Sequence, residues 1–256
     1  MAVELTTEGK LGTITLDNPP ANSYDLAMMS EFAGAVDEAI GSDLRAVILR
    51  SGSEKFFSAG ADVKKFLDGD VDANMEMIRT SQAAFARMAA APQVFIAEIA
   101  GHALGGGLEI TLACDLRYAS EGGYKLGTPE VTLGLLPGNG GTQRLTRLVG
   151  PARAMDLLIT GRTFTPEDAL GMGLVSELFA PAETKASVRG VAERFADGPA
   201  LALAAIKRCV HEGGQLPISD GLALEAELVE GLFRSADASE GMTAFVEKRQ
   251  PEFSGS

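Results

Sequence analysis

The segment Gly101–Glu109, with the sequence GHALGGGLE, places three consecutive glycines just before a carboxylate. Backbone without side chains lets a reacting group approach N–H donors more closely than any other residue allows. A second carboxylate, Glu130, ends the sequence GTPE twenty-one residues after Glu109. Two neighbouring glutamates can take up and release protons. These residues together predict a site that stabilises an oxyanion and adds or removes a proton beside it.

The triple glycine, Gly105–Gly107, is predicted to begin a helix, because the following segment Leu108–Cys114 is apolar and compatible with helix. The first N–H groups of a helix have no partner within it, and the positive end of the helix dipole lies there. Such a terminus can hold a carbonyl or enolate oxygen, as it holds anions in general. Two alternatives stay open, tight helix packing and a nucleotide phosphate site, although neither GxGxxG nor a P-loop pattern occurs.

A second loop of small residues, Ala59–Ala61, follows the apolar run 46–49 and is a candidate for another backbone donor. An ordinary turn between a strand and a helix would explain Gly60. It would not explain the small residue on each side of Gly60. Small side chains let the carbonyl group of a ligand approach the chain. We therefore expect this loop to supply a second backbone donor.

Each glutamate has a neighbourhood that suits proton transfer. Glu109 lies in an apolar stretch, where loss of hydration is expected to raise its pKa and make it a proton donor near neutral pH. Pro129 stiffens the turn that carries Glu130, and the N–H groups of the loop 134–141 are predicted to orient that carboxylate. A solvated surface position is the alternative for either glutamate alone. His102 is interpreted as structural, because the chain contains no GxSxG pattern.

The elements that must position these residues alternate between strand and helix in the first half. Period-two alternation predicts a strand over 11–16, and the short apolar runs 46–49 and 94–97 are typical of strands buried on both faces. Helices are expected over 25–40, with Asp25 as N-cap, and over 74–91. This order favours an α/β layer arrangement with crossover connections.

The second half changes character and is predicted to be mainly helical. Glycine and proline separate the expected helices. They cover 151–159, a short segment from Pro166, 182–196, 199–211, 217–234 and 237–249. We therefore expect a mixed core followed by a helical extension, with the boundary between 190 and 200.

Composition narrows the possible partners. The chain of 256 residues has a formal net charge of −13, which argues against nucleic acid because phosphate binding needs clustered Lys and Arg. The two cysteines, Cys114 and Cys209, are expected to be buried small hydrophobes. The two histidines are 109 positions apart and form no zinc-type spacing, so we expect no metal. The start of the chain has no signal-peptide pattern and no apolar run reaches a membrane span, so a cytoplasmic protein without membrane contact is expected.

Six sequence blocks, taken together, resemble those of the crotonase superfamily, the enoyl-CoA hydratase and isomerase fold, in its order and over nearly the full chain. They are FSAGAD (57–62), GHALGGGLE (101–109), Cys114-Asp115, GTPE (127–130), GLLPGNGGTQRL (134–145) and EGMTAFVEKR (240–249). The resemblance implies an α/β fold, a spiral of β-β-α turns over residues 1–195 that holds the active site. A helical trimerisation region over 196–256 would follow. It also implies an acyl-CoA thioester as substrate, no separate cofactor, and a homotrimer or a dimer of trimers.

The same resemblance implies roles for individual residues. The N–H groups of Ala61 and Gly106 match those that bind the thioester oxygen, and Glu109 and Glu130 match the two catalytic glutamates of hydratases. Gly138 matches a glycine whose N–H steadies Glu130. The remaining expected contacts to substrate are Ala59, Asp62, Val63 and Gly105, with Phe245 and Lys248 approaching the CoA of a neighbouring subunit.

Presence of both glutamates favours addition of water across the 2,3 double bond of a 2-enoyl-CoA, which gives a 3-hydroxyacyl-CoA. Isomerisation of a 3-enoyl-CoA to a 2-enoyl-CoA is the alternative, and a non-catalytic acyl-CoA-binding protein is a third possibility. Two departures from the family pattern bear on the substrate. The segment 121–127 is one residue longer than the common pattern and has Leu126 where Phe is usual, and Asn139 stands where Ala is frequent.

Overall fold

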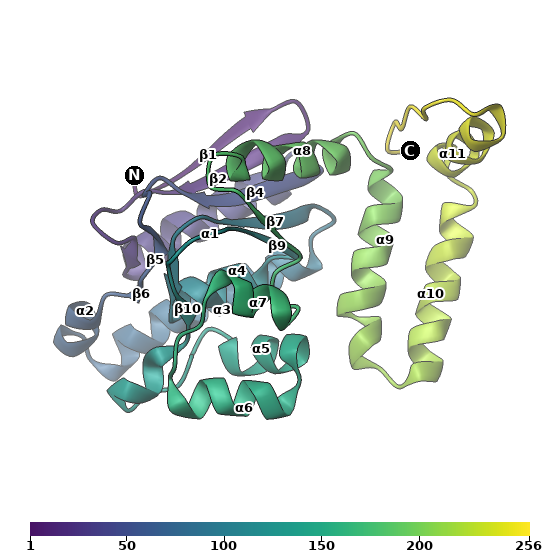
Figure 1. The fold of residues 1–256 in the computed structure, drawn as a ribbon. Helices are drawn as coiled ribbons and strands as arrows, with labels where there is room; N and C mark the ends of the chain where they lie inside the picture. Colours follow the sequence, from purple (N-terminus) through teal and green to yellow (C-terminus); the bar gives the residue numbers. More distant parts are fainter.

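The computed structural model describes residues 1–256 and has a six-stranded sheet at its centre (Figure 1). The strand order is β1-β2-β4-β7-β9-β11. The only antiparallel pair joins β1 to β2, whereas the other neighbours are parallel. The strands are β1 (Val3–Glu8), β2 (Leu11–Leu16), β4 (Ala46–Ser51), β7 (Val94–Ile99), β9 (Leu116–Ser120) and β11 (Glu177–Phe179).

Helices cover both faces of this sheet, which explains the continuous apolar runs in its central strands. In β4, Val47 and Leu49 pack in the cluster that includes helices α1 (Leu26–Ile40) and α3 (Val71–Ala90). The alternate residues, Ala46 and Ile48, pack on the opposite face against α8 (Thr184–Ala196). Successive side chains of a strand point to opposite faces, so a strand covered on both sides must be apolar throughout.

Helix α1 begins where the sequence predicted. The side chain of Asp25 accepts a hydrogen bond from the N–H of Met28 at 3.0 Å and caps α1. Burial of an apolar face then holds the helix, because Met29, Phe32 and Val36 are almost completely inaccessible to solvent. Phe32 meets Phe85 of α3 edge to face, with ring centroids 6.0 Å apart. Aromatic pairs in this geometry stabilise a core beyond the area that they bury.

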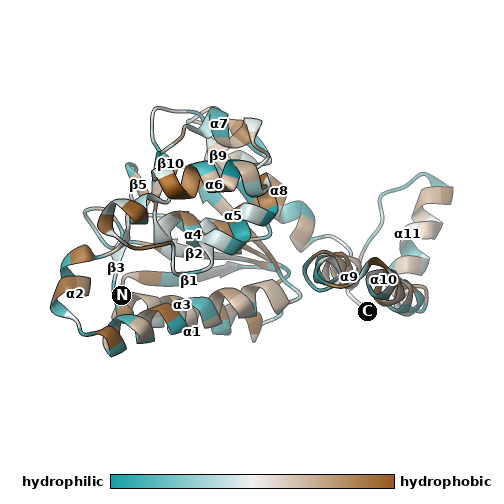
Figure 2. Ribbon diagram, turned by 90° about the horizontal axis from the view of Figure 1, so that it is seen from below, coloured by the Kyte–Doolittle hydropathy of each residue, from teal (hydrophilic) through white to brown (hydrophobic).

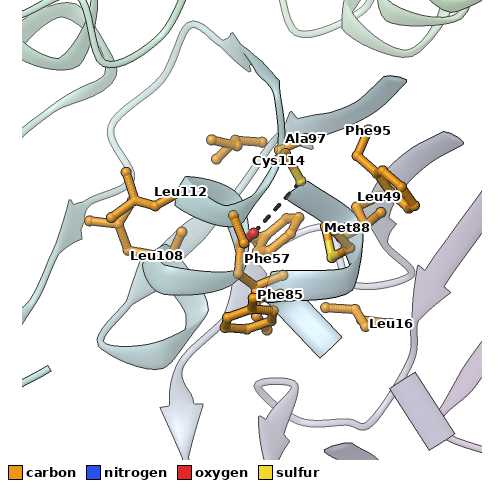
Figure 3. Packing of buried hydrophobic residues seen from close by; sticks show 14 of the residues in the cluster. Leu16, Leu49, Phe57, Phe85, Met88, Phe95, Ala97, Leu108, Leu112 and Cys114 are labelled. Carbon is orange, nitrogen blue, oxygen red and sulfur yellow. Dashed lines mark hydrogen bonds between the residues drawn. The ribbon is translucent and has the colours of Figure 1, made fainter. Parts of the chain in front are cut away.

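A short, fully buried helix, α4 (Gly106–Ala113), passes through the main core. Figure 3 shows Leu108, Leu112 and Cys114 packed among side chains of the central strands and of α3. The thiol of Cys114 contacts the carbonyl oxygen of Ile110 at 3.6 Å, and the residue is 3% exposed, as expected of a buried small hydrophobe. Because every residue of α4 is buried, the position of its N-terminus is fixed by packing.

Two small sheets carry the loops in front of α4. The first has the order β10-β8-β5, formed by β10 (Leu126–Gly127), β8 (His102–Leu104) and β5 (Phe56–Ser58). The second pairs β3 (Ser23–Tyr24) with β6 (Gly60–Ala61) in parallel. The side chain of Asn22 holds these sheets to the central one, since its Nδ2 donates to the carbonyl oxygens of Leu16 and Phe57 at 3.0 and 3.1 Å. Segments that are far apart in the sequence therefore meet at one place.

The extra residue in the segment 121–127 does not disturb the element that follows it. β10 keeps its register with β8, with Leu126 opposite Ala103, and the residues before it form a turn. Leu126 is completely buried, and the carbonyl oxygen of Gly127 accepts a hydrogen bond from the N–H of Gly105 at 2.8 Å. An extra residue in this segment would be tolerated, because loops tolerate changes of length better than strands do.

The last three long helices stand apart from the rest of the chain (Figures 1 and 2). The chain leaves α8 through Asp197–Pro199 and continues as α9 (Ala200–His211), α10 (Ile218–Leu232) and α11 (Ala236–Glu247). α9 is attached to the core by the buried Lys207, whose Nζ lies 2.8 Å from Oδ2 of Asp115 and donates to the carbonyl oxygens of Met88 and Gln93. We refer to residues 200–247 as the helical arm.

The mixed α/β class that the sequence predicted is confirmed. The expected strands and helices occur within a few residues of their predicted bounds, as α1, α3, β4 and β7 illustrate. Several elements were not predicted, among them β1, β9 and the two-residue strands β3, β6 and β10. No helix is both long and apolar enough to cross a membrane.

Candidate active site

Each glycine of the triple glycine lies against a different group, and none of the three leaves room for a side chain. Gly105 has a φ of 56°, and a Cβ there would lie 2.9 Å from Oε1 of Glu130. A Cβ on Gly106 would overlap the hydroxyl group of Tyr24, and one on Gly107 would overlap the carbonyl oxygen of Ser58. Close approach therefore explains all three glycines.

The N–H groups of Gly106 and Gly107 form no hydrogen bond within the chain, as the first N–H groups of a helix generally do not. The loop Ala59–Ala61 comes directly against them, since a Cβ on Gly60 would lie 3.1 Å from the nitrogen of Gly106. The N–H of Asp62 donates to Tyr24 in β3 at 2.8 Å. Because successive N–H groups of an extended chain point to opposite sides, that of Ala61 points away from β3. The expected pair of donors, Ala61 and Gly106, is thus brought together.

Glu109 is 1% exposed and is held by two backbone donors. Its Oε1 accepts hydrogen bonds from the N–H groups of Asn139 and Gly141, both at 2.7 Å. Both donors lie in the segment 137–141, which leads into α5 (Gly141–Val149) and whose last residue begins that helix. Gln82 and Arg144 hold this loop from outside by donating to the carbonyl oxygens of Gly138 and Asn139 at 2.7 and 2.8 Å.

Opposing effects set the ionisation of Glu109. Burial raises its pKa to about 7, and the nearby carboxylate of Glu130 adds to the increase. The hydrogen bonds from Gly141 and Asn139 and the charge of Arg144 act in the other direction. A carboxyl group with a pKa near neutrality can exchange a proton in both directions at physiological pH. The predicted rise in the pKa of Glu109 therefore has the physical cause that the sequence indicated.

Glu130 lies in the first turn of the short 3-10 helix Pro129–Leu133 and points its carboxylate at the triple glycine. Its Oε2 is buried and has no hydrogen-bond partner. Burial raises the pKa of Glu130 as well. Two carboxyl groups of raised pKa thus lie at the start of α4, that of Glu109 in its first turn and that of Glu130 beside Gly105. Such a pair is expected to share protons rather than to ionise fully.

One predicted interaction is wrong in detail. The loop 134–141 was expected to orient Glu130, with Gly138 as the donor that the resemblance implied. The N–H groups of this loop that bind a glutamate are instead those of Asn139 and Gly141, and their acceptor is Glu109. The reason is the path that this loop takes through the fold. The loop turns back over α4 before α5 begins, which puts its N–H groups over Glu109 rather than Glu130.

Sequence reasoning missed one residue of the site, Tyr24. It is 2% exposed, and its hydroxyl oxygen accepts a hydrogen bond from Nδ2 of Asn139 at 2.8 Å. Burial, together with the charges of Glu109 and Glu130, raises the pKa of Tyr24 above its ordinary value, so the phenol is neutral. The only signal in the sequence was an aromatic residue next to Asn22 and Asp25, 82 positions before Gly106, and nothing linked it to the glycines.

The other predicted contacts to substrate lie at the entrance to this region or far from it. The N–H of Ala59 donates to the carbonyl oxygen of Ala21 at 2.9 Å, so it is not free to bind a ligand. The side chain of Asp62 caps α2 (Val63–Asp68), because its Oδ1 accepts a hydrogen bond from the N–H of Lys64. Val63 is 46% exposed. A groove beside these residues is lined by parts of α1, α2 and α3, namely Asp25, Leu26, Ala27, Asp62, Lys65, Phe66, Gly69, Ala73, Asn74 and Met77.

Phe245 and Lys248 do not reach the glutamates of their own chain. Both lie at the end of the helical arm, far from α4 in Figure 1. Phe245 is 85% exposed, and Lys248 ends α11 in the left-handed conformation with a φ of 57°. His102 is structural, as expected. Its Nδ1 accepts a hydrogen bond from the N–H of Lys125 at 3.0 Å and its ring packs on Phe56.

Comparisons with known proteins match nearly the whole chain. Residues 6–256 match the family model described as enoyl-CoA hydratase/isomerase. A probable enoyl-CoA hydratase of Rhizobium meliloti is 40% identical over 96% of this chain and 95% of its own length. A short-chain-enoyl-CoA hydratase of Clostridium acetobutylicum is 35% identical over 98% and 96%. The crystal structure of an enoyl-CoA hydratase from Bacillus anthracis superimposes with a TM-score of 0.95 at 34% identity and covers both chains completely.

Proposed function

The chain belongs to the enoyl-CoA hydratase/isomerase family, and on that premise we propose that it adds water across the 2,3 double bond of a 2-enoyl-CoA. The observation that carries the proposal is the pair of carboxyl groups at the start of α4, those of the buried Glu109 and the half-buried Glu130, near the unpaired N–H of Gly106. An acyl-CoA bound there needs no separate cofactor, because CoA is part of the substrate.

The thioester oxygen is placed between the N–H groups of Ala61 and Gly106. As the oxygen of water bonds to C3, the electron pair of the C2–C3 double bond shifts toward the thioester oxygen to give the enolate, and two fixed donors stabilise this negative charge more than they stabilise the neutral carbonyl. Each such donor typically lowers a barrier by about 3 kcal/mol. The start of α4 adds the positive end of the helix dipole. Gly106 itself carries no side chain that could block the approach of the thioester oxygen to its N–H.

The two glutamates share the proton transfers. As the oxygen of water bonds to C3, one carboxylate takes a proton from the water. The other carboxyl group gives its proton to C2, and the pair holds one proton before and after the reaction. The raised pKa values of Glu109 and Glu130 support this division, because burial favours the protonated form that one of the two carboxyl groups needs in order to donate a proton.

The third proposed feature is the assembly of the site from two chains. Phe245 and Lys248 are exposed at the end of the helical arm, remote from the glutamates of their own chain. In a trimer they would contact the CoA of a neighbouring subunit. Exposed apolar side chains along the arm support an assembly of this kind, because large apolar patches mark protein–protein contacts.

Mass spectrometry of the products distinguishes hydration from isomerisation. Incubation with a 2-enoyl-CoA in water enriched in oxygen-18 should give 3-hydroxyacyl-CoA with one labelled oxygen atom. A parallel incubation with 3-enoyl-CoA should yield 2-enoyl-CoA only slowly. Rapid conversion of the 3-enoyl thioester without hydration of the 2-enoyl thioester would favour the isomerase. The panel should include short-chain and dicarboxylic substrates, because relatives are named short-chain-enoyl-CoA hydratase and 2,3-dehydroadipyl-CoA hydratase.

A further inference from the structure

Tyr24 is a buried polar residue that the proposed mechanism does not use, and its position in the site is unusual. It comes from the two-residue strand β3, whose partner is the strand of Ala61. Its hydroxyl group reaches across to Gly106 so closely that any side chain there would overlap it. Tyr24 therefore contacts both segments that carry the proposed oxyanion donors.

The hydroxyl group is held by one neighbour, and its proton is uncommitted. Nδ2 of Asn139 donates to the hydroxyl oxygen at 2.8 Å, and the hydroxyl group donates to no other atom of the chain. The backbone N–H of the same Asn139 donates to Oε1 of Glu109 at 2.7 Å. Tyr24 and Glu109 are thus fixed relative to each other by a single residue.

Two other buried polar atoms in the same place lack a partner, Oε2 of Glu130 and Oδ1 of Asn139. Buried polar groups are almost always hydrogen-bonded, and an exception calls for a bound molecule or a functional role. Oε1 of Glu130 lies against Gly105, and the hydroxyl group of Tyr24 lies against the next residue, Gly106. The carboxyl group of Glu130 and the hydroxyl group of Tyr24 therefore both lie beside the start of α4.

We infer that Tyr24 is the water-positioning residue of the proposed hydration, with its O–H donating to the water that lies between Glu109 and Glu130. A buried water typically makes about three hydrogen bonds. The water donates its two hydrogen atoms to the two carboxyl groups, and one lone pair of its oxygen accepts a third hydrogen bond from the hydroxyl group of Tyr24. The other lone pair of the water then faces C3 of the enoyl group. This inference rests on the proposed function.

Tyr24 keeps its proton throughout this step. Burial and the two neighbouring carboxylates raise its pKa, which leaves it a neutral donor. The O–H bond to the water orients the nucleophile, and the proton that leaves the water goes to a carboxylate. Orientation of a reactant by fixed groups contributes to rate by reducing the motion that must be lost at the transition state.

The substitution Tyr24→Phe tests the inference, because it removes the hydroxyl group and keeps the ring. We expect kcat for hydration of 2-butenoyl-CoA to fall roughly 10- to 100-fold with little change in KM. A second reaction reports on the rest of the site. Exchange of the C2 protons of butanoyl-CoA with deuterated water needs a carboxylate and the oxyanion donors but no addition of water. That exchange should stay within about three-fold of the wild-type rate.

Tyr124→Phe is the matched control. The hydroxyl group of Tyr124 donates to the carbonyl oxygens of Ile99 and Ser120 at 2.9 and 2.7 Å, away from the glutamates. Its loss should leave both reactions unchanged. If Tyr24→Phe does not fold, Asn139→Ala, which frees the hydroxyl group of Tyr24, should lower hydration more than exchange.

The outcomes separate this inference from the proposed function. Absence of hydration by the wild-type protein contradicts the proposed function itself. Hydration by the wild type that survives Tyr24→Phe within about three-fold overturns the role of Tyr24. An equal fall of hydration and exchange, in whichever of the two variants folds, also overturns it, because Tyr24 would then act on the oxyanion donors or on the fold.

Discussion

Glu109 combines burial, which disfavours its charged form, with two hydrogen bonds that favour it. The residue is 1% exposed, and its carboxylate accepts hydrogen bonds from the N–H groups of Asn139 and Gly141. Desolvation is the larger effect, so the pKa is raised to about 7. A buried carboxyl group that is only half ionised at neutral pH costs stability but can act as acid and as base.

This cost gives the stability of the protein a predictable pH dependence. The pKa of Glu109 is raised from 4.5 to about 7 in the native state. The native protein therefore binds more protons than the unfolded chain over this range, and the free energy of unfolding falls as pH rises through it. Glu109→Gln removes this dependence. Between pH 5 and pH 8 the stability of the variant relative to wild type should increase by about 3 kcal/mol.

Urea unfolding of both proteins across that range measures the difference. Glu167→Gln, at an exposed position in α7 (Pro166–Gly171), controls for the general effect of removing a carboxylate. A difference between Glu109→Gln and wild type that stays constant with pH would show that Glu109 is ionised in the native state at pH 5.

At the scale of elements, the loop 137–141 decides how Glu109 is held. Arg144 connects this loop to the core, because it donates to the carbonyl oxygen of Asn139 at 2.8 Å and lies over the ring of Phe85 at 5.6 Å. Its charge also lowers the pKa of Glu109. Position and ionisation of the carboxylate therefore depend on the same side chain of α5.

Arg144→Met should shift the pH profile of hydration. Loss of the positive charge raises the pKa of Glu109 further. The limb of the pH profile of kcat/KM that follows this titration should therefore shift to higher pH, by roughly 0.5 to 1 pH unit. Arg147→Met, on the exposed side of the same helix, is the control. Coincident profiles for Arg144→Met and Arg147→Met would mean that Arg144 does not act on Glu109.

The sequence predicted the long elements well and the short ones poorly, for a physical reason. Periodicity over ten or more residues indicated α1 and α3, and apolar runs indicated β4 and β7. The pair of strands that presents Tyr24 and Ala61 has two residues in each strand, too few for any pattern. What fixes these strands is long-range contact, including the hydrogen bonds of Asn22, and such contacts are not visible in local sequence.

The same reasoning explains which site residues were found. The triple glycine and the glutamates were identified from local sequence, and the structure brings them together. The donors to Glu109 were assigned to the wrong carboxylate, because the path of the loop 134–141 over α4 depends on tertiary packing. Tyr24 was missed since no local pattern joins β3 to α4.

At the scale of the whole molecule, the helical arm indicates how copies of the chain assemble. Many large apolar side chains on it are exposed, among them Ile206, Val210, Ile218, Leu222, Phe233, Met242, Phe245 and Val246. Single exposed apolar residues are common, but a series along three helices is typical of an interface. We therefore expect α9–α11 to be covered by neighbouring subunits in a homotrimer or a dimer of trimers.

Phe233→Glu should disrupt this assembly, because it places a charge in a predicted apolar interface at a residue that is 69% exposed in the single chain. Sedimentation equilibrium should give the mass of a trimer or hexamer for wild type and a smaller mass for the variant. The KM for acyl-CoA should rise with dissociation if Phe245 and Lys248 serve a neighbouring site. Val71→Glu, at another exposed apolar residue outside the arm, should leave the mass unchanged. A monomeric wild-type protein of full activity would contradict the shared site.

The central claim is that Glu109 and Glu130 together add water to an enoyl thioester, and substitution of each by glutamine tests it most directly. Both variants keep the size of the side chain and lose the ability to exchange a proton. The measurement compares kcat for hydration of 2-butenoyl-CoA with the Kd of butanoyl-CoA, which reports an intact binding site. We expect kcat to fall roughly 100- to 10,000-fold in each variant while Kd changes by less than about three-fold. Wild-type turnover in both Glu109→Gln and Glu130→Gln would contradict the account.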